Sequence, residues 1–333
     1  MAPRLKVAPG QLLEGRFLVL EQIAQGGMST VFKAADLAHC NALVAVKVPL
    51  AQYSSGVGSW SMFQREAEIG GRLEHPNIVR FTELSQPAQR SYVVTEYLSG
   101  QSLGTLVGEG RRLLEPDALR IASQVCEAVD YLHGRGIVHY DLKPDNVIVG
   151  DDGRIVLIDF GMAHRAVTGR FSFGATAPPF ASANYVAPEQ LQRHRGQRSV
   201  DIYAIGAMLY EMLTGRAPFE HDDPFVIASA RQIGDPPAPR AVQPSISPQA
   251  EEIVLRALRR NPKQRYRTAG ELKAELDAPA AVRVSGLARH LVPVTRWRKA
   301  VRAARFVALV AIAPIAVLIL SFRVLWWYLE RRP

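Results

Sequence analysis

Two neighbouring stretches decide the fold: His139-Tyr140-Asp141-Leu142-Lys143-Pro144-Asp145-Asn146 and, after a short gap, Ile158-Asp159-Phe160-Gly161. Asp141 can accept a proton, and the side-chain oxygens of Asn146 and Asp159 are ligands that suit Mg²⁺. The residues between them, Val147–Ile158, read as a β-hairpin with its turn at Asp151-Asp152-Gly153. A solvent-exposed loop can contain the same residue types. Features elsewhere in the chain are therefore needed to distinguish a catalytic site from such a loop.

The region before these stretches, from about residue 15 to residue 94, alternates short β-rich runs with turns. One helical pattern interrupts it, at about 62–73, and ends before His75-Pro76 because proline disfavours a continuing helix. The expected strands are Phe17–Leu20, Val31-Phe32, Leu43–Val48 and Tyr92–Val94.

Three features of this region can bind phosphate, and each also has an ordinary structural explanation. Gly26 and Gly27 lie between two predicted strands, where glycines let backbone N–H groups approach a phosphate or simply form a hairpin turn. Lys47 lies in an apolar strand and can bind phosphate or face solvent. Glu66, in the predicted helix, can pair with Lys47 or remain one more exposed helix charge.

The region after Ser102 is mostly helical up to Leu276. Residues 161–183 have no period and read as a long loop, which in a compact domain tends to be functional. The loop ends at Ala187-Pro188-Glu189, and Asp201 opens an apolar helix over 202–213. Glu189 and Arg265 can form a buried ion pair, although each alone would be read as a surface charge.

Taken together, these motifs resemble those of the protein kinase family, and within it the bacterial eukaryotic-like (Hanks-type) serine/threonine kinases. The resemblance covers about Phe17 to Leu276 and rests on the order of the motifs, since each motif alone is weak. It implies an α+β, two-lobed fold with a β-rich N-lobe (16–98) and a mostly helical C-lobe (99–277). The string Leu142-Lys143-Pro144-Asp145-Asn146 resembles the serine/threonine type rather than the tyrosine type.

The resemblance also implies a role for each site residue. Asp141 would orient the substrate hydroxyl and take its proton, Lys143 would stabilise the γ-phosphate, and Glu66 would hold Lys47 against the α- and β-phosphates. Asn146 and Asp159 would bind Mg²⁺, with Mn²⁺ as an alternative ion. ATP would lie against Ile23, Ala24, Gly26, Gly27, Ser29, Val31, Ala45, Lys47, Thr95, Glu96 and Leu98, with Thr95 as gatekeeper and the backbones of Glu96 and Leu98 on the adenine.

Three departures from the family pattern modify this expectation. Two of the three loop glycines are replaced, by Ala24 and Ser29. Tyr140 replaces the arginine that normally binds a phosphate on the activation loop, so we expect activity that depends little on phosphorylation there. Gly70 and Gly71 lie in the helix of Glu66, where each costs about 1 kcal/mol relative to alanine, so the helix is expected to be adjustable.

Composition and charge exclude some partners. The 333 residues contain 40 Lys and Arg and 31 Asp and Glu; ten of the bases and one of the acids lie in 279–333, which leaves 30 of each in the remainder. A neutral globular part with a basic tail argues against a nucleic-acid binder. Two cysteines, Cys40 and Cys126, exclude a disulfide scaffold and suit a reducing compartment.

The tail predicts a membrane anchor. Phe306–Phe322 is uncharged over 17 residues, about 26 Å as a helix, and extension to Tyr328 would span a bilayer of about 30 Å. A core helix or an interfacial helix is the alternative. Basic residues on the N-terminal side favour a cytoplasmic kinase domain. We therefore expect a leader (1–15), a kinase domain (16–277), a basic juxtamembrane linker that binds anionic lipid (278–305), a transmembrane helix (306–328) and a short tail (329–333) without an external sensor domain.

The expected function is transfer of the ATP γ-phosphate to Ser or Thr hydroxyls of proteins by a kinase at the inner membrane, with a homodimer for autophosphorylation as one arrangement. A pseudokinase scaffold is the first alternative, and retention of all five catalytic and metal residues argues against it. A small-molecule kinase is the second, and the peptide-platform residues Glu189, Asp201 and Arg265 argue against that.

Overall fold

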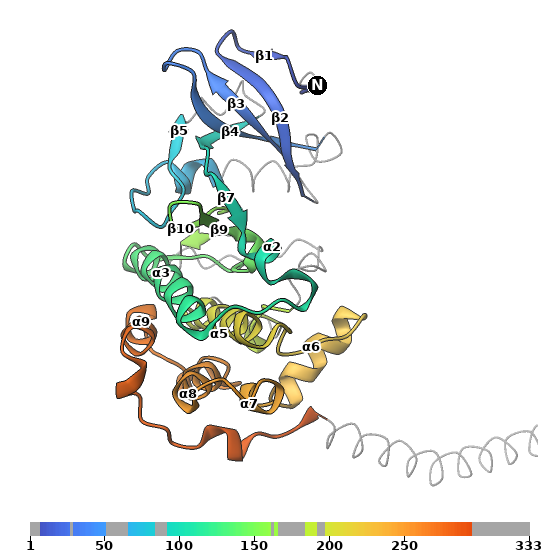
Figure 1. Ribbon diagram of the computed structural model, residues 1–333, viewed down its shortest axis with the longest axis vertical. Coiled ribbons are helices and arrows are strands. Elements are labelled where there is room, and N and C mark those ends of the chain that lie inside the picture. The colour runs from blue at the N-terminus through green and yellow to red at the C-terminus, as the bar shows by residue number, and fades with distance from the viewer. Residues whose placement is uncertain are drawn as a thin grey trace, which may run out of the picture.

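The computed structural model describes residues 7–26, 29–50, 66–83, 92–160, 163–165, 184–191 and 197–294. A β-sheet forms one end of the molecule and a group of helices forms the other (Figure 1). This arrangement agrees with the two lobes that the sequence predicts.

The N-lobe sheet is antiparallel and has the strand order β1-β2-β3-β4-β6-β5. In β4, Val44, Val46 and Val48 are buried in the lobe's own core, and side chains alternate between the two faces of a strand. Lys47 therefore lies on the opposite face. The strands are β1 (Leu12–Leu13), β2 (Phe17–Gln25), β3 (Ser29–Asp36), β4 (Ala42–Pro49), β5 (Phe81–Glu83) and β6 (Val93–Glu96).

The described part of the expected leader, residues 7–15, belongs to this sheet. Leu13 is buried in the same cluster as Phe17, Val7 packs against that cluster, and Gly10 donates a backbone hydrogen bond to Val19. The domain therefore begins earlier than its family motifs do. Without Val7 and Leu13, the edge of the sheet and the apolar cluster behind it would be exposed to water.

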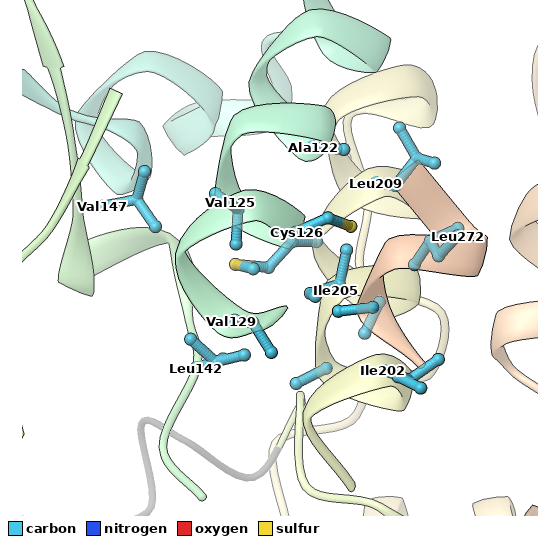
Figure 2. Packing of buried hydrophobic residues seen from close by; sticks show 14 of the residues in the cluster. Ala122, Val125, Cys126, Val129, Leu142, Val147, Ile202, Ile205, Leu209 and Leu272 are labelled. Carbon is cyan, nitrogen blue, oxygen red and sulfur yellow. The ribbon is translucent and has the colours of Figure 1, made fainter. Parts of the chain in front are cut away.

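The C-lobe is built around α5 (Ser199–Thr214), which is buried almost all round. Helices α3 (Glu115–Gly134) and α9 (Ala269–Asp277) pack with it, and Figure 2 shows Ala122, Cys126 and Val129 of α3 facing Ile205 of α5 and Leu272 of α9. Cys126 is a buried core residue, whereas Cys40 is exposed. The remaining helices are α2 (Leu103–Val107), α4 (Pro188–Leu191), α6 (Pro224–Ile233), α7 (Pro239–Val242) and α8 (Pro248–Ala257).

Short strands and 3₁₀ turns connect these helices and form the floor of the site. The hairpin predicted at 147–158 is confirmed as the antiparallel pair β9 and β10. The short elements are β7 (Gly100–Ser102), β8 (Ile137–Val138), β9 (Val147–Gly150), β10 (Ile155–Leu157), β11 (His164–Arg165), η1 (Gly108–Gly110), η2 (Pro144–Asn146), η4 (Pro262–Gln264), η5 (Pro279–Ala281) and η6 (Leu287–His290).

Residues 278–294, which we call the C-terminal strap, run back across the C-lobe below α8 and α7 towards α6 (Figure 1). The buried Glu252 carboxylate accepts hydrogen bonds from the Ser285 hydroxyl and from the backbone N–H groups of Ser285, Gly286 and Leu287. Buried carboxylates need such donors. The first part of the expected linker, 278–294, is therefore packed against the domain.

The predicted transmembrane helix, 306–328, lies outside the described residues, as does the rest of the basic segment from 295. Among the residues up to 294 that the structure describes, no helix is both long enough and apolar enough to cross a bilayer.

Candidate active site

The charged centre of the site joins three distant segments of the chain. Lys47 Nζ lies 2.8 Å from each carboxylate oxygen of Glu66 and 3.1 Å from Asp159 Oδ2. Burial alone would lower the pKa of Lys47, but the charges of Asp159 and Glu66 outweigh it and raise the pKa above its ordinary value. Burial raises the pKa of Glu66 to about 7, although Lys47 opposes the change. The side chain of Lys47 therefore stays positively charged beneath the N-lobe sheet.

The catalytic loop is anchored from below by Asp201 of α5. Its carboxylate accepts hydrogen bonds from the backbone N–H groups of His139 and Tyr140, both at 2.9 Å, and lies 2.8 Å from His133 Nε2. Asp201 and His133 are only 1% and 2% exposed. Burial opposes the charge of Asp201, but the bonds from His133 and the His139 amide lower its pKa. The carboxylate therefore stays ionised and can hold the loop.

Tyr140 has a backbone conformation that its residue type disfavours. Its φ is 67°, in the left-handed region, where a bulky residue costs about 1–3 kcal/mol. The Tyr140 N–H bond to Asp201 holds this conformation, and Gln190 Nε2 donates to the Tyr140 carbonyl at 3.4 Å. The loop is therefore bent sharply just before Asp141.

Asp141, Lys143 and Asn146 converge beyond this bend. Lys143 Nζ lies 3.2 Å from Asp141 Oδ2, and Asn146 Nδ2 donates to the Asp141 carbonyl at 2.8 Å. The position of Nδ2 leaves the amide oxygen of Asn146 for another partner. A lysine beside the carboxylate suits stabilisation of the charge on a transferred group.

The oxygen donors fit a magnesium ion. Asn146 supplies an amide oxygen, and Asp159, whose side chain is 37% exposed, supplies a carboxylate that faces the same centre as Lys47. Mg²⁺ takes few protein ligands and completes its shell with water and phosphate oxygens. In the part of the chain that the structure describes, no three His, Cys, Asp or Glu side chains are grouped so as to hold a metal ion.

The nucleotide side of the site is formed by β2, β3, β4 and β6. Ala24 pairs with Val31, and the Gly26 N–H donates to the Ser29 carbonyl at 2.8 Å. Ala45 pairs with Thr95 across β4 and β6, so two small side chains face each other at the predicted adenine position. Ile23 lies in β2, and Glu96 and Leu98 end β6 and follow it. Gly27 lies outside the described residues.

A row of rings connects the two lobes behind the charged centre. The ring of Phe160 lies 5.5 Å from that of His139 and 6.4 Å from that of Phe81, measured between centroids. A Cβ atom added at Gly70 would lie only 2.0 Å from the Phe81 ring. Gly70 is one helical turn after Glu66, so its missing side chain makes room for the ring of Phe81.

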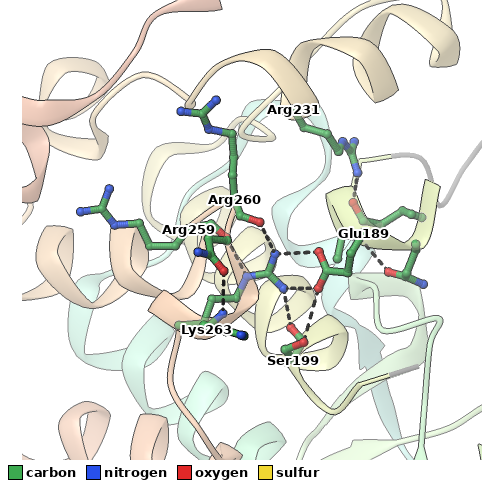
Figure 3. Close-up of polar contacts among 11 residues, drawn as sticks. Glu189, Ser199, Arg231, Arg259, Arg260 and Lys263 are labelled. Atoms are coloured by element: carbon green, nitrogen blue, oxygen red, sulfur yellow. Dashed lines mark hydrogen bonds and ion pairs between the residues drawn. The ribbon is translucent and has the colours of Figure 1, made fainter. Parts of the chain in front are cut away.

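The predicted ion pair beneath the loop is present. Arg265 donates to both carboxylate oxygens of Glu189, at 2.5 Å and 2.8 Å, and also to the Ser199 carbonyl at 2.8 Å. Figure 3 shows Glu189 and Ser199 within this network of polar contacts. The geometry explains why two charges can be buried here, since each has several partners.

The family model for the protein kinase domain matches residues 17–275. The chain belongs to the protein kinase family. Its motif residues form two hydrogen-bonded groups, Lys47 with Glu66 and Asp159, and Asp141 with Asn146.

Curated relatives give the branch of the family. Probable serine/threonine-protein kinase PknB of Lactococcus lactis is 32% identical over 267 residues, which cover 80% of this chain and 42% of that protein. Serine/threonine-protein kinase PrkC of Bacillus subtilis is also 32% identical over 267 residues, covering 80% and 41%. Serine/threonine-protein kinase PknB of Mycobacterium tuberculosis is 33% identical over 268 residues, covering 79% and 43%. The chain thus spans about two fifths of the length of these bacterial kinases.

The kinase motifs did not indicate three residues that the structure places at the site. His133 supports Asp201, Gln190 binds the Tyr140 carbonyl, and Phe81 touches the ring of the Asp159-Phe160 motif. Gln190 directly follows the motif Ala187-Pro188-Glu189, so its place in the chain was a usable signal. His133 and Phe81 act through contacts between distant segments, which no local pattern reveals.

Proposed function

We propose that this chain transfers the γ-phosphate of ATP to Ser and Thr hydroxyls of proteins, as a kinase tethered to the inner membrane. One observation carries the catalytic part of the proposal. Five residues spread over about a third of the chain, from Lys47 to Asp159, converge in pairs at hydrogen-bond distance. The names of the bacterial relatives support the choice of Ser and Thr as acceptors.

The residues act mainly by position and charge, because the transition state of phosphoryl transfer spreads negative charge over the transferred group. Lys47, held by Glu66, orients the α- and β-phosphates. Asn146 and Asp159 would hold Mg²⁺, which neutralises phosphate charge when bound. Lys143 stabilises the γ-phosphate, and Asp141 orients the acceptor hydroxyl and takes its proton.

Tyr140 supports an activity that needs little phosphorylation of the loop. The position that would carry a phosphate-binding arginine carries a phenol, which has no positive charge; burial raises its pKa to about 12, so it is neutral at physiological pH. Substitution of Thr168, Ser172 and Thr176 by alanine, all outside the described residues, is expected to leave transfer within about threefold. Loss of transfer with the fold intact would contradict this part of the proposal.

The deciding experiment compares transfer of labelled γ-phosphate to dephosphorylated casein by the wild type, by Asp141→Asn and by Asp152→Asn. Asp141→Asn removes the proton acceptor, and we expect a loss of at least 100-fold. Asp152 is an exposed turn residue, so Asp152→Asn serves as the matched control. A wild type that binds ATP without transferring phosphate would favour the pseudokinase scaffold. A wild type that phosphorylates small molecules alone would favour the small-molecule kinase.

The membrane tether rests on the uncharged run 306–322, its extension to Tyr328 and the basic residues before it. A chain that ends after Val294 keeps the strap and removes both. We expect the full chain to sediment with inner membranes and the shorter chain to remain in the supernatant. Sedimentation of the shorter chain with membranes would contradict the tether.

A further inference from the structure

Helix α6 contains a buried arginine that the proposed chemistry does not use. Arg231 is 1% exposed and is among the largest fully buried side chains of the described residues. Its guanidinium lies 5.9 Å from the centroid of the Phe219 ring. Burial lowers its pKa, so burial is costly for this group. A buried guanidinium is kept in a fold only when it has partners that offset its desolvation.

One partner of Arg231 lies on the substrate side of the C-lobe. Arg231 Nη1 donates to the backbone carbonyl of Val186. Figure 3 shows Arg231 reaching from α6 towards the segment that carries Glu189. Val186 lies three residues before Glu189, which is held by Arg265, the residue directly after η4. Two buried arginines from different elements therefore hold the same short segment.

This segment is connected to the catalytic loop. Gln190 binds both the Ala187 N–H, at 2.8 Å, and the Tyr140 carbonyl. Tyr185 donates to Glu211 of α5 at 2.6 Å. Residues 184–187 also directly follow the stretch 166–183, which lies outside the described residues. A shift of the Val186 carbonyl would therefore change the surface next to Asp141 where an acceptor peptide has to lie.

Helix α6 is itself held from outside by the strap. The Asp235 N–H donates to the Val292 carbonyl and the Val292 N–H to Asp235 Oδ2, both at 2.8 Å. A Cβ atom at Gly234 would lie 2.9 Å from the Val294 nitrogen, so the two backbones are in direct contact. Val294 packs against Ile227 and Ala230 of α6. The strap thus limits the movement of the helix from which Arg231 reaches inward.

We infer that Arg231 is a positioning residue for the protein substrate: it fixes the backbone of residues 184–187, with α6 braced by the strap. The inference rests on the proposed function, since it names the surface that would receive the acceptor peptide. Arg265 holds Glu189 through an ion pair, whereas Arg231 holds a neutral carbonyl. At Val186 its contribution is therefore to fix the direction of the backbone.

The first test does not require catalysis. Hydrogen–deuterium exchange of residues 184–191 is compared in full-length wild type, in Arg231→Met and in Arg267→Met, an exposed arginine that serves as control. Methionine fills a similar volume without a donor. We expect exchange in this segment to become about tenfold faster in Arg231→Met, as loss of a hydrogen bond to a charged group predicts, and to be unchanged in Arg267→Met. Unchanged exchange in Arg231→Met would overturn the inference.

The second test separates positioning from a general structural role. In Arg231→Met we expect KM for dephosphorylated casein to rise about tenfold while KM for ATP stays within twofold. An equal rise in both constants, or no rise for casein, would overturn the inference. A wild type that fails to phosphorylate casein refutes the proposed function instead, and the exchange experiment still decides whether Arg231 holds the segment.

A second variant covers the case in which Arg231→Met does not fold. Gly234 is buried and has an ordinary backbone conformation, and the Cβ of Gly234→Ala would lie 2.7 Å from Val294 Cγ2 and 2.9 Å from the Val294 nitrogen, so the strap has to shift. We expect a rise of about threefold in KM for casein and a smaller increase in exchange at residues 184–191. Gly134→Ala, where an added Cβ meets nothing, is the control. Equal behaviour of the two glycine variants would count against the role of the strap.

Discussion

The two sides of the active site are held in different ways. On the N-lobe side, Lys47, Glu66 and Asp159 come from three elements and meet through charge. On the C-lobe side, His139 and Tyr140 are tied by backbone hydrogen bonds to Asp201, inside the most buried helix of the molecule. The first arrangement can be lost by a small movement of a helix, whereas the second is lost only when the core itself opens.

One fold can thus combine a firmly held catalytic loop with a phosphate-binding lysine whose position can adjust. Asp141 follows a loop that backbone hydrogen bonds tie to the buried Asp201. The phosphate-binding Lys47 depends on the position of the helix of Glu66, which packs on Phe81 through Gly70. Variants on the two sides should therefore separate stability from activity.

The largest effect is expected from Asp201→Ala. Loss of the buried carboxylate leaves His133 and two backbone N–H groups without their acceptor, which costs about 3–5 kcal/mol. We expect both the free energy of unfolding and phosphate transfer to collapse together, measured by urea denaturation and the casein assay. Asp222→Ala, at an exposed position, is the control. Full activity in a stable Asp201→Ala protein would contradict the anchoring role.

Lys47→Met should remove the charged contacts on the N-lobe side of the site and leave the C-lobe side intact. We expect transfer to fall by about 100-fold or more, with the domain still folded. The pKa of Glu66, about 7, should rise further without Lys47. A carboxyl group with a raised pKa binds more protons in the folded than in the unfolded state, so stability declines as the pH rises from the unfolded value through the folded one.

The pH dependence can be measured by urea denaturation between pH 5 and pH 8. The decline should be steeper in Lys47→Met than in the wild type and should disappear when Glu66→Gln is added. Lys33→Met, a lysine on the neighbouring strand, should behave as the wild type. A flat profile in Lys47→Met would show that Glu66 does not take up a proton.

Gly70→Ala should loosen the N-lobe side without removing a charge. The new Cβ collides with the Phe81 ring, and overpacking of this kind costs about 1–3 kcal/mol. We expect transfer to fall about tenfold, since Phe81 contacts Phe160 beside Asp159. The double variant Gly70→Ala/Phe81→Leu restores space and should recover most of the activity. Failure of this rescue would refute the steric explanation.

The smallest effect on activity is expected from Glu252→Ala, far from both sides. Its carboxylate holds the strap through three backbone N–H groups, and we expect a loss of about 2 kcal/mol in the free energy of unfolding. Transfer should stay within about threefold. Glu127→Ala, an exposed residue of α3, is the matched control for the denaturation measurement.

The catalytic residues could be predicted from the sequence because phosphoryl transfer requires particular side chains in a fixed chain order. Lys47 contacts Glu66 and Asp159, and Asn146 contacts Asp141; the ion pair of Glu189 with Arg265 and the hairpin after Asn146 are also present. The roles of these residues in binding and catalysis stay predictions. Gly27, the loop up to residue 183 and the anchor lie outside the described residues, so those expectations remain predictions.

Features that depend on pairing between distant segments could not be predicted. β2 continues to Gln25 rather than ending at Leu20, because residues 21–25 also pair with β3. These residues are exposed and do not alternate between apolar and polar, so the sequence pattern did not indicate a strand there. The left-handed backbone of Tyr140 is set by Asp201, sixty-one residues later. The size match of Gly70 and Phe81 has no sequence signature, since a glycine in a helix reads only as a weak point.

The strap determines where the chain can be truncated without exposing buried residues. The family pattern stops at residue 275, yet a chain shortened there would uncover the apolar patch of Phe219, Ile227 and Ala230 and deprive the carboxylates of Asp235 and Glu252 of their amide donors. A fragment chosen by homology alone would therefore be prone to aggregate, and the fragment suited to expression and crystallisation extends to Val294.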